Sequence, residues 1–371
     1  MKYIRFFETV GIQDVGLVGG KNASLGEMYQ SLSHLGVNVP NGFATTRDAY
    51  LLLLAQNDLE QRIEALIGGL DVNNVAQLQV CGKAVRELIV NEPLPDELIL
   101  EVRAAYERLS EGYGDQQTDV AVRSSATAED LPDASFAGQQ ESFLNIRGEL
   151  SLLIHIRKCF ASLFTDRAIS YRHSRGFDHR NVALCVGVQK MVRSDLASSG
   201  VMFTLDTQSG SDHIIMINSV FGLGENMVGG RVNPDEFYVF KPTLKQGKSA
   251  IIKRQLGSKE MKMIYDDKLK TLNISTTQSE RSQFSLSDDE LITLARYALV
   301  IETHYALPMD IEWAKEGGNG KLYIVQARPE TVHSKRLRSK NAHIIEKYKV
   351  KEDTSKRTQL VGGRAIGEKV G

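Results

Sequence analysis

Residues 309–328 read MDIEWAKEGGNGKLYIVQAR, two runs of alternating apolar and polar residues separated by a glycine-rich turn. The alternation predicts a β-hairpin in which residues 309–315 pair with residues 321–328. Because a hairpin buries one face against a core, we expect an antiparallel sheet with one polar face at this end of the chain.

The polar positions of this hairpin carry groups suited to phosphate chemistry. Period two places Asp310 and Glu312 on one face of the first strand, and Gln326 and Arg328 share a face of the second. Carboxylate and amide oxygens suit Mg2+, and a guanidinium suits a phosphoryl group. The same pattern also fits a solvated face with a cross-strand ion pair, which taken alone is the commoner arrangement.

The segments before the hairpin predict a mixture of helices and strands. Residues 46–110 have helical periodicity, and short alternating runs predict a series of strands between residues 182 and 274. A helix is expected from Ser287, with Glu290 completing a capping box, to about Tyr305. The predicted fold class is therefore α+β.

Two basic residues adjoin loops of small residues. Lys21 follows Gly19-Gly20 at a predicted helix start, where backbone amides and an ammonium suit a phosphate. Arg123 leaves a short strand for a small-residue loop that extends to Gly138 and could cover polyphosphate oxygens. A plain turn with a solvated lysine and an ordinary surface loop are the alternatives, since no Walker A motif is present.

Two further segments suit the rest of a nucleotide. A predicted strand ends at Gln189-Lys190-Met191-Val192, where extended backbone beside an apolar side chain could receive an adenine edge. Glu225 lies in the turn Gly222-Leu223-Gly224-Glu225, as a ribose-binding acid would. A core strand and an unspecific glycine turn remain open as alternatives.

Composition limits the class of partner. The chain has 371 residues, a formal net charge of -1 and 42% hydrophobic residues, so charge gives no argument for binding nucleic acid or a membrane. The length predicts more than one lobe. Three cysteines without CxxC spacing predict reduced, buried thiols. Without a signal peptide or an apolar run of membrane-spanning length, we expect a cytoplasmic location.

Taken in order, these segments resemble the nucleotide-binding domain shared by phosphoenolpyruvate synthase, pyruvate phosphate dikinase and rifampin phosphotransferase. The resemblance covers about residues 10–335. It rests on the hairpin segments Asp310-Ile311-Glu312-Trp313 and Gln326-Ala327-Arg328-Pro329-Glu330-Thr331, and on five earlier motifs: VGGKNASLGEM from Val18, VRSSATAED from Val122, SFAGQ from Ser135, SGVMFT from Ser199 and GLGE from Gly222.

The resemblance implies an α+β, ATP-grasp-like fold of two lobes with a cleft between them. The implied lobes are residues 1–197, which include the helical segment 46–110, and residues 198–333. Residues 334–371 would be a linker and the start of a truncated phosphohistidine domain.

Site roles also follow from the resemblance, for ATP and Mg2+ as cofactors. The implied catalytic residues are Arg328, Arg123 and Lys21, and the implied metal ligands are Glu312 and Gln326. The implied nucleotide contacts are Lys21, Arg123, Ser135, Phe136, Ala137, Gly138, Gln189, Lys190, Met191, Val192, Glu225 and Asp310.

Within the family, the opening GGKNASLGEM and the loop AEDLPDASFAG favour the synthase branch, which converts ATP, pyruvate and water to AMP, phosphoenolpyruvate and phosphate through a phosphohistidine. None of the eight histidines lies in the family's Thr-Cys-His-Ala-Ala motif. We therefore expect the partners to be the phosphohistidine and pyruvate-binding domains of a longer enzyme, with a possible homodimer formed through those regions. A rifampin-type or other dikinase, and a non-catalytic nucleotide-binding regulatory module, are the alternatives.

Overall fold

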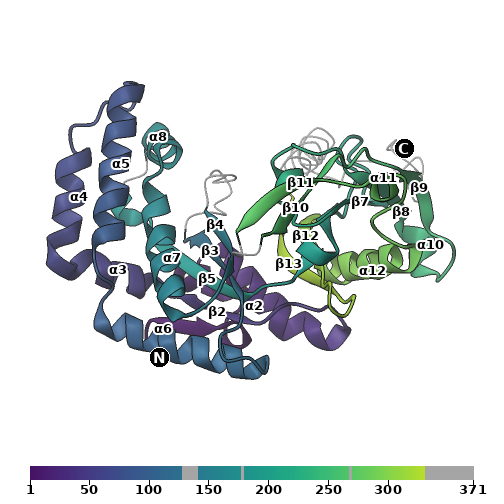
Figure 1. Ribbon diagram of the computed structural model, residues 1–371, viewed down its shortest axis with the longest axis horizontal. Helices are drawn as coiled ribbons and strands as arrows, with labels where there is room; N and C mark the ends of the chain where they lie inside the picture. Colours follow the sequence, from purple (N-terminus) through teal and green to yellow (C-terminus); the bar gives the residue numbers. More distant parts are fainter. Residues whose placement is uncertain (128–140, 177–178, 267–269, 331–371) are drawn as a thin grey trace, which may run out of the picture. The chain divides into compact units, whose positions relative to one another are not determined.

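The computed structural model describes residues 1–127, 141–176, 179–266 and 270–330. The described residues up to Glu330 form one compact unit built around two antiparallel sheets (Figure 1). Helices and strands both contribute, so the predicted α+β class is confirmed.

The first sheet has five strands in the order β1-β2-β5-β3-β4. Their bounds are β1 Ile4–Phe6, β2 Gly42–Thr45, β3 Val120–Ala126, β4 Ser142–Ile146 and β5 Leu184–Lys190. Strand β5 is buried along nearly its whole length because β2 and β3 flank it on either side. Because β5 is the central strand, its last residues, Gln189 and Lys190, lie at the middle of one edge of the sheet.

Helices surround this sheet and share its apolar core (Figure 1). Their bounds are α3 Arg47–Ala55, α4 Leu59–Ile67, α5 Val75–Asn91, α6 Asp96–Gly112, α7 Glu149–Ala161 and α8 Asp166–Ser174. The helices predicted within residues 46–110 are confirmed as α3 to α6. Helix α7 packs directly on β3 and β5, with Ile156 and Phe160 fully buried.

The second sheet has six strands in the order β13-β12-β6-β7-β8-β9. Their bounds are β6 Ser198–Phe203, β7 Ile214–Phe221, β8 Asp235–Phe240, β9 Ile251–Gln255, β12 Met309–Lys315 and β13 Leu322–Pro329. Helix α12 (Asp288–Tyr305) lies along one face of the sheet (Figure 1) and contacts β7 and β12. Its buried residues, among them Leu291 and Leu294, pack with Ile311 and Trp313 in a second core.

Smaller elements complete the unit. A separate hairpin consists of β10 (Met261–Tyr265) and β11 (Thr271–Ser275). The short helices are α1 Val15–Val18, α9 Glu225–Val228, α10 Lys241–Lys245 and α11 Gln278–Arg281. The 3-10 turns are η1 Phe7–Thr9, η2 Ile12–Asp14, η3 Ser33–Leu35, η4 Gln56–Asp58, η5 Ser162–Phe164, η6 His179–Asn181 and η7 Ser194–Leu196.

Helix α2 (Gly20–Leu32) contacts both sheets, through β3 and β5 in the first and β13 in the second. Its apolar residues Leu25, Met28 and Leu32 belong to the second core, although they precede that core's strands by more than 150 positions in the sequence. The first forty residues therefore join the two sheets.

The hairpin predicted from residues 309–328 is confirmed. Glu312 lies opposite Gln326 and Asp310 lies opposite Arg328, which gives the shared polar face that period two predicts. A bulge between Glu312 and Trp313 shifts the register beyond that point, a feature that the alternation did not indicate.

The capping box of α12 is also confirmed. The Glu290 N–H donates to Ser287 Oγ, and the Ser287 N–H donates to Glu290 Oε2. All three cysteines are free and buried, as expected, and burial raises the thiol pKa of Cys159 and Cys185. Among the helices that the structure describes, none is long and apolar enough to cross a bilayer.

Candidate active site

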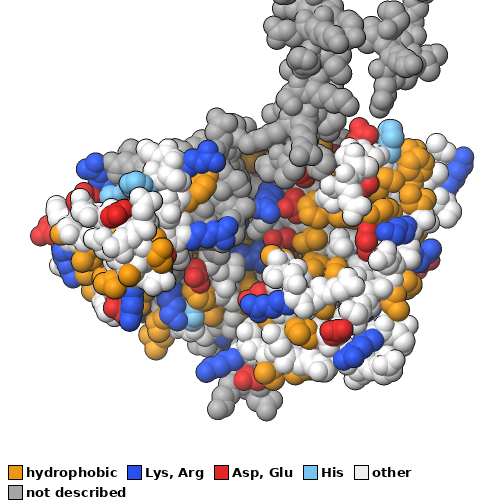
Figure 2. Space-filling model, turned by 90° about the horizontal axis from the view of Figure 1, so that it is seen from above, with side chains coloured by type: hydrophobic (Ala, Val, Ile, Leu, Met, Phe, Trp, Pro, Cys, Tyr) orange, Lys and Arg blue, Asp and Glu red, His pale blue; other side chains and the backbone are white. Residues whose placement is uncertain are grey.

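A cavity of about 510 Å3 is lined by residues from both sheets. It brings together predicted site residues that lie up to 307 positions apart in the sequence: Lys21, Arg123, Gln189, Lys190, Met191, Val192, Glu225, Glu312, Gln326 and Arg328. Figure 2 shows basic and acidic side chains close together near the middle of the upper face. We refer to this cavity as the central cavity.

Hairpin β12–β13 supplies one wall of the central cavity. Arg328 donates from Nε and Nη2 to Asp310 Oδ2, both at 2.9 Å. Asp310 itself does not line the cavity, and its contact with the site is this ion pair with Arg328. Burial raises the Asp310 pKa, and the charge and hydrogen bonds of Arg328 lower it in part. The ion pair thereby holds the guanidinium at the cavity wall.

Glu312 and Gln326 are cross-strand neighbours that both line the cavity. One carboxylate and one amide oxygen at adjacent positions fit the protein's share of a Mg2+ site, because Mg2+ usually takes one or two protein ligands and completes its shell with phosphate oxygens and water. Within the described ranges, no group of three or more His, Cys, Asp or Glu side chains could hold a metal ion alone. A cation at this wall would thus depend on an oxyanion ligand.

Two basic residues face the hairpin from β3 and α2. Arg123 donates from Nη1 to Val325 O at 3.2 Å. Its Nε is buried, and no described residue accepts a hydrogen bond from it. Lys21 is the second residue of α2, and its backbone N–H donates to Ser125 Oγ at 3.1 Å. The cavity is therefore lined by positive groups from α2, β3 and β13, which suits a polyanion.

At the end of β5, several polar groups that the sequence left open for a ligand already bond to other parts of the chain. Gln189 donates from its amide to Pro40 O, and Lys190 forms a 2.6 Å ion pair with Asp119. The N–H groups of Lys190 and Met191 donate to Asn41 O and Asp119 O. Among the described residues we find no acceptor for the Val192 N–H, which leaves it as the donor that a planar base could use.

An apolar cluster closes this end of the cavity. Ala121, Met191 and Leu223 line the cavity and pack with Met263 and Tyr265 of β10. Apart from Met191, sequence reasoning missed this cluster because its members come from four separate segments and only the fold brings them together. The alternation of Met263 and Tyr265 in a short strand was the one local signal of a buried face.

Glu225 begins α9 directly after the glycine turn and lines the cavity, as do the backbone neighbours Leu223 and Gly224. Ser135, Phe136, Ala137 and Gly138 lie outside the described residues, so their predicted role as a phosphate cover has no structural counterpart here.

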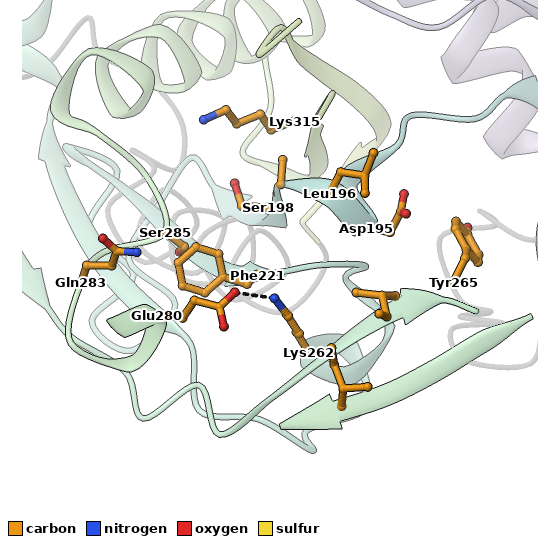
Figure 3. Close-up of a pocket in the computed structure, with 13 residues that line it drawn as sticks. Asp195, Leu196, Ser198, Phe221, Lys262, Tyr265, Glu280, Gln283, Ser285 and Lys315 are labelled. Carbon is orange, nitrogen blue, oxygen red and sulfur yellow. Dashed lines mark hydrogen bonds and ion pairs between the residues drawn. The ribbon is translucent and has the colours of Figure 1, made fainter. Parts of the chain in front are cut away.

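A second cavity of about 480 Å3 lies beside hairpin β10–β11 (Figure 3). Its two lysines are already paired, Lys262 with Glu280 and Lys315 with Glu290 at 2.5 Å. No predicted site residue that the structure describes lines it. Because glutamates neutralise both lysines, the second cavity suits a polyphosphate less well than the central cavity does. The central cavity is therefore the candidate active site.

Comparison with known proteins identifies the family of the chain. Residues 15–350 match a family profile described as pyruvate phosphate dikinase, AMP/ATP-binding domain. The chain is 54% identical to the phosphoenolpyruvate synthase of Helicobacter pylori over its full length and 47% of the relative's. It is 53% identical to that of Neisseria meningitidis, and 51% identical to that of Escherichia coli, covering 46% of each relative.

The chain thus spans about half the length of the curated relatives it matches. The profile covers most of the chain and includes every element that lines the central cavity. The chain belongs to the pyruvate phosphate dikinase AMP/ATP-binding domain family.

Proposed function

We propose that the chain is the ATP-binding and phosphoryl-donating part of a phosphoenolpyruvate synthase, in which ATP, pyruvate and water give AMP, phosphoenolpyruvate and phosphate. The supporting observation is the central cavity, which Lys21, Arg123 and Arg328 line together with the Glu312–Gln326 pair. Phosphoryl transfer depends chiefly on such positioning and charge stabilisation.

Each part of the cavity then has a role. The apolar cluster and the Val192 N–H receive the adenine ring, and Glu225 binds the ribose. Lys21 and Arg123 bind the phosphates, and Glu312 with Gln326 hold Mg2+, which would neutralise phosphate charge when bound. Arg328, oriented by Asp310, stabilises the charge that develops on the transferring group.

The acceptor would be a histidine in another part of the enzyme, which becomes a phosphohistidine. None of the six histidines within the described ranges lines the central cavity. The ATP-grasp-like arrangement of two lobes, with a boundary near residues 197 and 198, and a phosphohistidine domain beginning within residues 334–371, belong to the same proposal, as does a cytoplasmic location.

Arg328→Ala tests the proposal in the complete gene product. We expect single-turnover phosphoryl transfer from ATP to fall by about 100-fold or more, because a charge-assisted contact made in the transition state is lost. The dissociation constant for Mg-ATP should change by only a few-fold. Calorimetry and rapid-quench measurements supply the two readouts.

Arg147→Ala is the matched control, since Arg147 forms an exposed ion pair with Asp115 away from the cavity. It should change neither quantity. Transfer that survives in Arg328→Ala would instead favour a regulatory nucleotide-binding module. An unaltered chain that fails to bind Mg-ATP would reject the site itself.

A further inference from the structure

The first turn of α2 is bonded to both sheets. The Lys21 N–H donates to Ser125 Oγ of β3 at 3.1 Å, and Ser24 Oγ donates to Ala327 O of β13 at 2.7 Å. Residues three apart lie on the same side of a helix. One helical turn therefore spans the gap between the strand that carries Arg123 and the strand that carries Gln326 and Arg328.

The start of α2 packs closely against the first sheet. A Cβ on Gly19 would lie 2.3 Å from Ser125 Oγ and 2.5 Å from Ser125 O, and Gly19 has a φ of +82° that favours glycine. A Cβ on Gly187 of β5 would lie 2.2 Å from Asn22 Oδ1. The start of α2 is thus in close contact with β3 and β5 at these two glycines.

The contact with the second sheet is equally buried. Ser24 is 8% exposed, and its Oγ also lies 3.3 Å from the Tyr305 hydroxyl of α12. Its acceptor, Ala327 O, belongs to the residue between Gln326 and Arg328. A shift of this carbonyl would therefore move a proposed metal ligand and the proposed catalytic arginine together.

Neither serine lines the central cavity. Ser125 is 1% exposed, and both hydroxyls are used in bonds between elements. Their effect on a bound nucleotide must be exerted through Lys21 on one side and through β13 on the other. Arg123, which donates to Val325 O, is a second and parallel link between the same two strands.

We propose that Ser24 and Ser125 are positioning residues that set the spacing between the Lys21–Arg123 group and the Glu312–Gln326–Arg328 group. This inference rests on the proposed function. In-line phosphoryl transfer requires the attacking and leaving oxygens to be held in one geometry, and a misplacement of about 1 Å can cost about 100-fold in rate. A rigid turn of helix across the site supplies that precision.

Ser24→Val and Ser24→Thr form a matched pair for the test, because the two side chains have the same shape and only threonine keeps the hydroxyl. In the complete gene product, assayed below the melting temperature of both variants, Ser24→Val should transfer the phosphoryl group about tenfold more slowly or worse. Mg-ATP affinity should stay within about threefold. Ser24→Thr should recover most of the rate.

Ser125→Ala, which removes a hydroxyl without adding atoms, should give the same separation of rate from affinity. Ser31→Ala is the control on the same helix, because Ser31 donates within the helix to Glu27, and it should leave both quantities unchanged.

Unchanged transfer in Ser24→Val overturns the positioning role and leaves the proposed function intact. Equal losses of rate and affinity in both Ser24 variants also overturn it, because they indicate damage to the fold rather than to spacing. Absence of Mg-ATP binding by the unaltered protein overturns the proposed function, and the positioning role with it.

Discussion

The partly buried carboxylate of Asp310 orients Arg328 at the proposed site, although burial disfavours its charged form. Burial raises its pKa, which means that the folded protein holds the carboxyl proton to a higher pH than the unfolded chain does. The stability contributed by this group therefore falls as the pH rises from the unfolded value through the raised folded value. The charge and hydrogen bonds of Arg328 act in the opposite direction and favour the ionised carboxylate.

Asp310→Asn should consequently leave the free energy of unfolding unchanged or raise it, by about 1 kcal/mol or less, at pH 8. Phosphoryl transfer should fall because Arg328 loses its charged partner. The difference in stability between the variant and the unaltered chain should shrink as the pH is lowered toward 5. Urea unfolding at several pH values measures it.

Asp115→Asn is a control of opposite sign. The N–H of Gln117 and the charge of Arg147 lower the Asp115 pKa, so the variant should be less stable than the unaltered chain at pH 8. This difference should also shrink on acidification. A clear loss of stability in Asp310→Asn at pH 8 would contradict the account of the Asp310 carboxylate.

Strand β6 is the element on which the site's second sheet depends. It lies between β12 and β7, and Gly200 near its middle has no space for a side chain: a Cβ there would lie 1.9 Å from Asn218 O and 2.6 Å from Trp313 Cζ2. Gly200→Ala must push β7 or the indole away. Because β6 pairs with the strand that carries Glu312, the site is expected to move as well.

Gly200→Ala should therefore destabilise the chain by about 3 kcal/mol, as overpacking in a closed core does. Gly112→Ala, the same chemical change at the end of α6 with no atom within 4 Å, should be neutral or slightly stabilising. Urea midpoints compare the two variants. Similar urea midpoints for the two variants would mean that β6 and its neighbours move apart to accept the methyl group at little cost.

The sequence predicted those helices and strands whose own residues carry a recognisable pattern, such as alternation or a capping box. The alternation around Glu312 predicted the hairpin and its polar face, and Ser287 with Glu290 predicted the start of α12. The bulge after Glu312 was not predicted, because the alternation of apolar and polar residues carries no signal for a shift in the pairing of β12 with β13. The candidate site divides in the same way.

Chemical identity indicated the polar side chains of the site, and the fold brings eight of those predicted to one cavity. The apolar wall was missed, since Leu223, Met263 and Tyr265 have no distinctive chemistry and meet only in the folded chain. The predicted nucleotide contacts of Gln189 and Lys190 stay predictions; the sequence did not indicate that their side chains bond to Pro40 and Asp119, which lie outside the motif.

At the scale of the whole molecule, two cores meet at one cavity. The first core contains helices α3 to α7, while the second contains Trp313, the chain's single tryptophan, at 1% exposure. Helix α2 contributes to the second core and is bonded to both sheets. Tryptophan fluorescence therefore reports unfolding of the second core, and far-UV circular dichroism is dominated by helices of the first.

Because the central cavity is lined from both sheets, a ligand bound there should stabilise both cores together. Mg-ATP at 100 times its dissociation constant adds about 2.7 kcal/mol, which corresponds to a rise of about 4 °C in the melting temperature of a unit of this size. We expect the fluorescence and dichroism transitions to coincide and to shift equally. Arg123→Ala, which removes a cation proposed to bind phosphate, should reduce both shifts, whereas Arg147→Ala should leave them unchanged. A fluorescence transition that moves while the dichroism transition stays would show that the nucleotide is held by the second core alone, and that α2 does not couple the two.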